Sequence, residues 1–247
     1  MSIKIAVNYS PSFHPVKRKV KKIKFLVFHY TGMKSEDKSI KRLTEIQSQV
    51  SCHYLIKKNG EIINLVPDLY IAWHAGTSSW KNYKLLNKNS IGIEVTNPGH
   101  QFGYKKFPKK QINSLVKISN ILIKKYKINK RNILGHSDIA PERKKDPGEK
   151  FPWNFLYQNK IGIWHNLKSV KLKFLRNKTL LKKEINLFFK NLKILGYSNK
   201  AFILKNEAKY KKKLIIAFQR RFRPELVNGN LDKECLLIVS KLAKIYR

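Results

Sequence analysis

Short apolar runs alternate with helical stretches from residue 23 to about residue 165, and this alternation constrains the fold more than any other feature of the chain. The runs are short and rich in β-branched residues, and the stretches between them carry apolar side chains at helical intervals. The expected strands are 24–30, 53–57, 61–66, 90–96 and 132–135, and the expected helices are 35–50 and 108–126. The KKNG loop predicts a hairpin between the second and third strands. This order of elements is typical of an α/β domain.

A second, helical region follows a polar and basic stretch. Gly196 is a suitable C-terminal cap for one helix, and Asp232 is a suitable N-terminal cap for another. The expected helices are 181–195, 209–222 and 232–246, and the expected division is a domain over 1–165 (core 23–155), a linker over 166–178 and a three-helix domain over 179–247.

Charge and cysteine content bound the functional class. The net charge is +38 over 247 residues, which is typical of a chain with an anionic partner, but the lysines are spread along the whole length. Cys52 and Cys235 form no CxxC pair, so neither a disulfide framework nor a zinc knuckle is expected. Neither a signal peptide nor a membrane span is evident, so we expect a cytoplasmic protein, with the periplasm or cell envelope, reached by non-standard export, as the alternative.

Two histidines stand at the ends of predicted strands. His29 closes 24–30 and His136 follows 132–135, so the two imidazoles could meet at one edge of a sheet. Two imidazoles, one carboxylate and an open position suit a catalytic zinc ion. Spacing leaves two candidates for the carboxylate, Asp138 and Asp146, and favours Asp146 only slightly, because Pro147 follows it in a turn and Asp138 can instead cap a turn.

Three further residues have both a chemical and a structural interpretation. Glu94 lies within strand 90–96, where it is either the polar half of an amphipathic strand or a proton acceptor in a pocket. Lys144 is one of many lysines, although it lies close to Asp146. His74 follows a tryptophan and is either a pocket residue or a packed one.

Five blocks together resemble the zinc-dependent N-acetylmuramoyl-L-alanine amidases of the AmpD-like (amidase type 2) family. They are FHYTG at 28–32, SCHYLIKKNGEI at 51–62, AWHAG at 72–76, SIGIEVTN at 90–97 and GHSDIAPERKKDPG at 135–148. The resemblance implies a central mixed β-sheet flanked by helices, with one zinc ion per chain in a groove at a sheet edge. It implies peptidoglycan or muropeptides as the partner, and no nucleic acid is expected. Oligomeric state is not predicted.

The same resemblance implies roles for individual residues. The zinc ligands are His29, His136 and Asp146, the catalytic residues are Glu94 and Lys144, and the substrate-binding residues are Tyr30 and His74. The implied reaction is hydrolysis of the amide between N-acetylmuramic acid, or its 1,6-anhydro form, and L-alanine. The alternatives are a peptidoglycan sensor without hydrolysis and, from the charge, a nucleic-acid binder.

The C-terminal region resembles a second family, the three-helix peptidoglycan-binding domains. The matching blocks are INLFFKNLKILGYS at 185–198, LIIAFQRRFRPE at 214–225 and NGNLDKECLLIVSKL at 228–242. Asn228 and Cys235 stand where that family often has Asp and Thr, so the resemblance implies the fold more firmly than affinity for carbohydrate.

Overall fold

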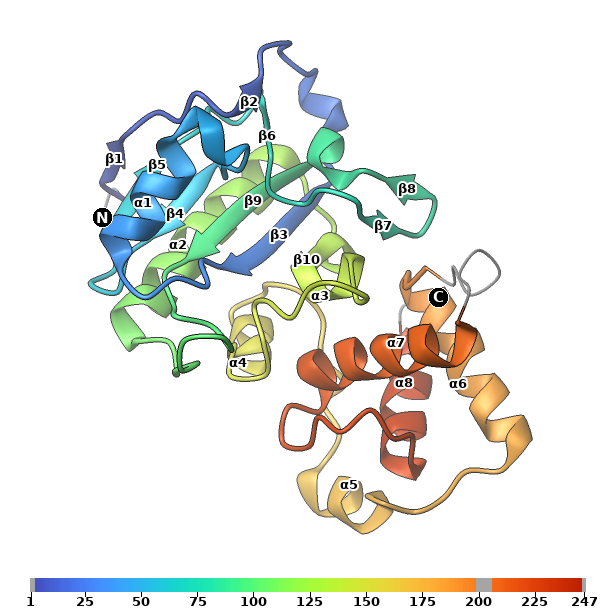
Figure 1. The fold of residues 1–247 in the computed structure, drawn as a ribbon. Helices are drawn as coiled ribbons and strands as arrows, with labels where there is room; N and C mark the ends of the chain where they lie inside the picture. Colours follow the sequence, from blue (N-terminus) through green and yellow to red (C-terminus); the bar gives the residue numbers. More distant parts are fainter. Residues whose placement is uncertain (1–2, 199–205, 246–247) are drawn as a thin grey trace.

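A twisted mixed β-sheet with helices on both faces is followed by a cluster of helices packed beside it (Figure 1). The structure is a computed structural model that describes residues 3–198 and 206–245. We call residues 3–165 the sheet region and residues 166–245 the helical region. The mixed sheet with flanking helices confirms the expected fold class.

Six strands form the main sheet in the order β1-β5-β4-β9-β3-β10. They are β1 Ile5–Val7, β3 Phe25–Tyr30, β4 Tyr54–Ile56, β5 Ile62–Asn64, β9 Ser90–Val95 and β10 Ile133–Gly135. The four strands β4, β9, β3 and β10 are mutually parallel, and β5 is antiparallel to β4. The β4–β5 pairing confirms the expected hairpin. Because β4, β9, β3 and β10 are parallel, their carboxyl ends meet at one edge of the sheet, and open α/β sheets bind ligands at this edge.

Helices α1, Glu36–Thr44, and α2, Lys109–Tyr126, cover opposite faces of the sheet. Leu43 of α1 packs with Leu55, whereas Leu115 of α2 packs in the cluster that holds Tyr54 and Ile56. Because side chains alternate along a strand, Leu55 marks the α1 face and its two neighbours mark the α2 face. The α1 helix ends six residues before the expected end at 50, and a short 3-10 turn follows it.

Several short elements complete the sheet region, and none of them was expected from the sequence. They are strands β2 Phe13–His14, β6 Ile71–Ala72, β7 Ser79–Trp80 and β8 Tyr83–Lys84, helices α3 His136–Ile139 and α4 Trp153–Gln158, and 3-10 turns at Val20–Lys22, Ile46–Ser48, Leu86–Asn89 and Lys130–Asn132. Elements of two to six residues are too short to carry a recognisable hydrophobic period.

The helical region contains α5 Ser169–Leu175, α6 Lys182–Leu195, α7 Glu207–Phe222 and α8 Lys233–Ile245. The stretch 166–178, expected as a linker, thus contains a helix. Gly196 follows α6 with φ 124°, and Asp232 Oδ1 accepts a hydrogen bond from the Cys235 backbone N–H at 2.9 Å before α8, as their residue types predicted. Tyr246, the expected last residue of the third helix, lies outside the described residues.

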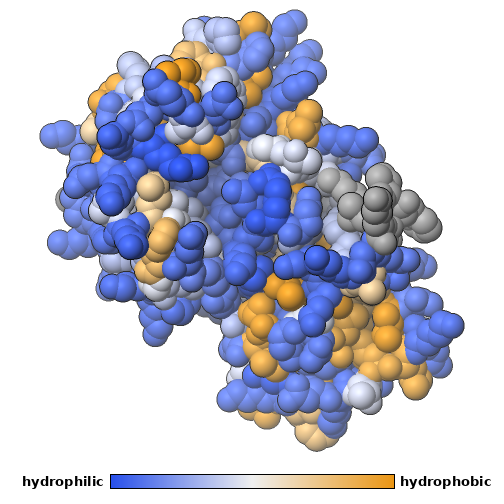
Figure 2. Space-filling model, in the orientation of Figure 1, coloured by the Kyte–Doolittle hydropathy of each residue, from blue (hydrophilic) through white to orange (hydrophobic). Residues whose placement is uncertain are grey.

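One continuous apolar cluster joins the two regions. It runs from the sheet through Trp80 and Ile139 to Tyr197 and Phe222, and the Trp80 and Tyr197 ring centroids are 4.8 Å apart. The surface is mostly hydrophilic over the visible face, as expected from dispersed lysines (Figure 2). In the described ranges, no helix has both the length and the apolar character needed to cross a membrane.

Candidate active site

Three adjacent parallel strands bring their ends together to form the site. The register pairs His29 of β3 with Glu94 of β9, and β10 places Gly135 beside Phe28, so His136 emerges next to His29. Glu94 in turn pairs with Leu55, which marks the α1 face. The chain therefore presents His29 and Glu94 on one face of the sheet, beyond the part that α1 covers.

His29, His136 and Asp146 form a nearly equilateral triangle of ligand atoms. His29 Nδ1 and His136 Nδ1 are 2.9 Å apart, and they lie 3.1 Å and 3.0 Å from Asp146 Oδ2. A tetrahedral zinc ion with ligands about 2.0–2.1 Å away separates them by about 3.3 Å, so the triangle fits that ion closely. All three residues are buried. Two neutral imidazoles and a carboxylate are also the donor set of catalytic zinc sites.

Burial and mutual contact set the charges of these ligands. Burial lowers the pKa of His29 to about 4, and the neighbouring His136 adds to the effect. Burial alone would raise the pKa of Asp146, but the adjacent His136 and His29 hold it well below its usual range. Near neutral pH, His29 is therefore neutral and Asp146 is ionised, the protonation states in which these groups bind a metal ion.

Hydrogen bonds behind the imidazoles orient them. Ser90 Oγ donates to the Leu86 carbonyl at 2.7 Å, so it accepts from His74 Nε2–H at 3.1 Å. His74 Nδ1 is then an acceptor for His29 Nε2–H at 3.0 Å, which leaves the His29 Nδ1 lone pair directed into the triangle. His136 Nε2 lies 3.2 Å from the Ala75 carbonyl, so it too keeps Nδ1 unprotonated.

The structure separates the two carboxylates that spacing left open. Asp146 lies in the triangle, and the Ser137 backbone N–H donates to its carbonyl oxygen at 2.8 Å. Asp138 instead caps α3, because its Oδ2 accepts from the Gly135 backbone N–H at 2.8 Å. Asp138 is thus directed toward the turn and the helical region, in the capping arrangement that its position also allowed.

The Glu94 carboxylate lies beside the triangle and has both a raised pKa and an oxygen that is unpaired within the described part of the chain. Its Oε2 is buried and has no hydrogen-bond partner among the described residues. Burial, reinforced by the Asp146 charge and opposed by Lys144, raises the pKa of Glu94 from 4.5 to about 8. A half-buried carboxyl with a free oxygen and a pKa near neutrality is suited to exchanging protons with a bound molecule.

A cavity of about 850 Å³ connects these residues with the remaining candidates. Tyr30, His74, Glu94 and Lys144 line it together with His136 and Asp146. The Tyr30 hydroxyl lies 2.9 Å from His100 Nδ1, so it is held at the cavity wall. The structure thus places six of the seven candidates named from the sequence at one cavity, and the seventh, His29, joins them through its contacts with His136 and Asp146.

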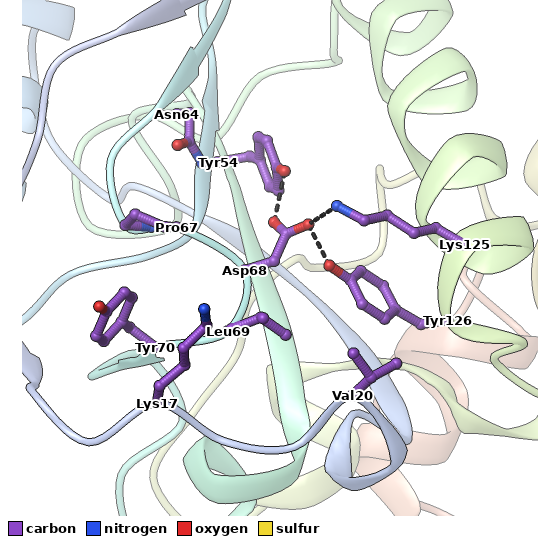
Figure 3. Close-up of a pocket in the computed structure, with 10 residues that line it drawn as sticks. All are labelled: Lys17, Val20, Tyr54, Asn64, Pro67, Asp68, Leu69, Tyr70, Lys125 and Tyr126. Carbon is purple, nitrogen blue, oxygen red and sulfur yellow. Dashed lines mark hydrogen bonds and ion pairs between the residues drawn. The ribbon is translucent and has the colours of Figure 1, made fainter.

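A second cavity, of about 580 Å³, lies on the α2 face and provides a contrast (Figure 3). Its carboxylate, Asp68, accepts hydrogen bonds from Tyr54, Lys125 and Tyr126 at 2.6, 2.8 and 2.5 Å. Burial alone would raise the pKa of Asp68, but these donors lower it overall. A fully bonded, ionised carboxylate stabilises the fold and offers no free oxygen for proton transfer, unlike Glu94.

Sequence reasoning missed two supporting residues of the site. Arg143 donates through Nη2 to the carbonyls of Ala75 and Thr77 at 2.5 and 2.6 Å, which holds that loop against His136. Ser90 completes the hydrogen bonds behind His29. Neither residue gives a sequence signal by itself, because an arginine among basic residues and a serine that begins a strand are both common.

The amino-acid sequence matches a family model described as N-acetylmuramoyl-L-alanine amidase over residues 19–149. The chain is 37% identical to N-acetylmuramoyl-L-alanine amidase AmiD of Escherichia coli strain K12, over 91% of this chain and 84% of that protein. It is 42% identical to 1,6-anhydro-N-acetylmuramyl-L-alanine amidase AmpD of Haemophilus influenzae, over 43% of this chain and 56% of that protein.

Solved structures show the same architecture. The E. coli AmiD structure, a complex with anhydro-N-acetylmuramic acid-L-Ala-D-gamma-Glu-L-Lys, superposes with a TM-score of 0.79 and 34% identity, covering 94% of this chain and 92% of that one. AmpDh3 from Pseudomonas aeruginosa gives a TM-score of 0.79 and 32% identity, covering 94% of each chain. Both relatives match the sheet and helical regions together, and the chain belongs to the N-acetylmuramoyl-L-alanine amidase family.

Proposed function

We propose that the chain hydrolyses the amide bond between N-acetylmuramic acid, or its 1,6-anhydro form, and L-alanine in peptidoglycan or muropeptides, using one zinc ion. The observation that carries this proposal is the triangle of His29, His136 and Asp146 beside the free Glu94 carboxylate in one cavity. The named relatives support it, since AmiD and AmpDh3 have been solved with anhydromuramoyl peptides bound.

His29, His136 and Asp146 would hold the zinc ion through Nδ1, Nδ1 and Oδ2. When bound, zinc acts as a Lewis acid and lowers the pKa of water to about 7. Glu94 accepts the proton of the attacking water and then delivers it to the leaving amine of L-alanine, which its free Oε2 and raised pKa permit. The Lys144 ammonium, in the same cavity, stabilises the negative charge that develops on the carbonyl oxygen.

We assign Tyr30 to the substrate-binding wall, because its hydroxyl group lies at the cavity surface beside His100. His74 also lines the cavity, but Ser90 and His29 occupy both of its ring nitrogens. We therefore assign His74 to holding His29 rather than to binding substrate. Arg42 and Lys145 add positive charge to the cavity, which suits the carboxylates of a stem peptide.

We assign residues 1–165 to the amidase domain and residues 179–247 to a peptidoglycan-binding-like domain. Helices α6, α7 and α8 overlap the three blocks of the second resemblance. Gln219, within the AFQRRF block, accepts from the Gly229 backbone N–H at 2.8 Å and donates to the Asn230 carbonyl at 2.7 Å. This residue of the block therefore holds the turn before α8, and glycan binding by this domain is a separate property to be measured.

The zinc requirement is tested with purified protein and anhydromuropeptides. We expect one zinc ion per chain, release of free stem peptide, loss of release on chelation and its return with added zinc. His29→Ala should lose the metal, whereas His14→Ala, a change at an exposed histidine, should not. Release that continues in metal-free protein, or zinc-loaded protein that leaves the muropeptides intact, would contradict the proposal.

A further inference from the structure

The Asp138 carboxylate accepts hydrogen bonds from the helical region, and it lies in the segment that carries two of the metal ligands. Asp138 is 1% exposed and lies two residues after His136. Its Oδ1 accepts from the Tyr197 hydroxyl at 2.5 Å, and its Oδ2 accepts from Arg221 Nη1 at 2.5 Å as well as from the Gly135 backbone. Two of its three donors therefore come from the helical region.

Arg221 holds the same segment at a second point. Its Nη2 donates to the Ile133 carbonyl at 2.8 Å, and its guanidinium lies 4.4 Å from the centre of a Trp153 ring. The side chain is 2% exposed, so these bonds form away from water and are correspondingly strong. His136 lies between the two points that Arg221 holds, Ile133 and Asp138.

The contact extends to the third ligand. The Ser137 backbone donates to the Asp146 carbonyl, so a shift of α3 would move two of the three ligands. Arg220, next to Arg221 on α7, places its Nε 3.9 Å from Glu149 Oε2, three residues after Asp146. Helix α7 therefore contacts the chain both before His136, at Ile133, and after Asp146, at Glu149.

We propose that Arg221 and Tyr197 are positioning residues that act through Asp138 to keep His136 and Asp146 at metal-binding spacing. The helical region is then part of the scaffold of the metal centre, independently of whether it binds glycan. This inference rests on the zinc site of the proposed function. Outer residues of this kind typically change metal affinity about 10- to 100-fold when they are removed.

The test is zinc affinity of the full chain, measured by competition with a chromophoric chelator. Arg221→Met should weaken zinc binding about 10- to 100-fold, and Tyr197→Phe should weaken it severalfold. The matched control is Arg223→Met, which breaks the buried pair with Asp232 (2.6 Å) at the end of the same helix without touching α3. This control should lower stability yet keep zinc affinity within about twofold of the wild type.

A second readout does not depend on the metal. In zinc-free protein, backbone hydrogen exchange across residues 134–146 should be faster in Tyr197→Phe than in wild type and unchanged in Arg223→Met. Tyr197→Phe removes only one hydroxyl group. If Arg221→Met does not fold, hydrogen exchange and zinc affinity in Tyr197→Phe test the positioning role. Wild-type exchange and zinc affinity in Tyr197→Phe, or equal weakening by the Arg221 and Arg223 variants, would overturn the inference. A wild-type chain that binds no zinc would instead overturn the proposed function. The exchange measurement would still test whether Tyr197 and Arg221 hold α3 in place.

Discussion

Two carboxylates, Asp68 and Glu94, show how surroundings decide the role of a side chain. Asp68 receives three donors and is ionised, whereas Glu94 has an oxygen without a partner in the described residues and a pKa of about 8. The difference lies in the neighbours, because hydrogen-bond donors surround Asp68 and none reaches Glu94 Oε2 in the described residues. Only the second arrangement leaves a group that can both accept and return a proton.

The raised pKa of Glu94 predicts a pH dependence of stability in zinc-free protein. Between pH 4.5 and about 8 the folded state holds the Glu94 proton more tightly than the unfolded state, so ionisation as the pH rises costs stability. Relative to Glu94→Gln, the wild type should lose up to about 1.4 kcal/mol per pH unit across this window. Urea denaturation of both proteins at pH 5, 6.5 and 8 measures it, and parallel curves would contradict the assigned pKa.

At the scale of elements, long segments with a periodic pattern were predictable from the sequence. Features that depend on contacts between distant residues were not. Strand β9 and helix α2 lie within one residue of their expected bounds, because their patterns are strong over six or more residues. The choice between Asp138 and Asp146 could not be made from spacing, since it depends on Tyr197 and Arg221, which lie 59 and 83 residues after Asp138.

Strand β9 also needs a residue without a side chain at its centre. A Cβ on Gly92 would lie 2.4 Å from His74 Cγ, so Gly92→Ala should displace the ring that holds His29. We expect a loss of stability of about 1–3 kcal/mol and about tenfold weaker zinc binding. Ile91→Val, a smaller change at a buried neighbour on the same strand, should leave zinc affinity unchanged. Chelator competition checks both, and wild-type affinity in Gly92→Ala would show that His74 does not orient His29.

At the scale of the whole molecule, the two regions share one apolar core and meet at the loop that carries two ligands. The sequence divided the chain at a basic stretch, but composition carries no information on how two regions pack. The lysines that carry most of the +38 charge are likewise dispersed along the whole sequence. The proposed function rests on the cavity at the strand ends and not on the net charge.

The central claim, that Glu94 and the His–His–Asp triangle act together in amide hydrolysis, is tested most directly by mass spectrometry of anhydromuropeptides incubated with zinc-loaded variants. Glu94→Gln should keep one zinc ion per chain and release stem peptide about 10²- to 10⁴-fold more slowly than wild type. Glu142→Gln, which removes an exposed carboxylate from the same loop, should cleave at the wild-type rate. Wild-type release of stem peptide by zinc-loaded Glu94→Gln would contradict the account.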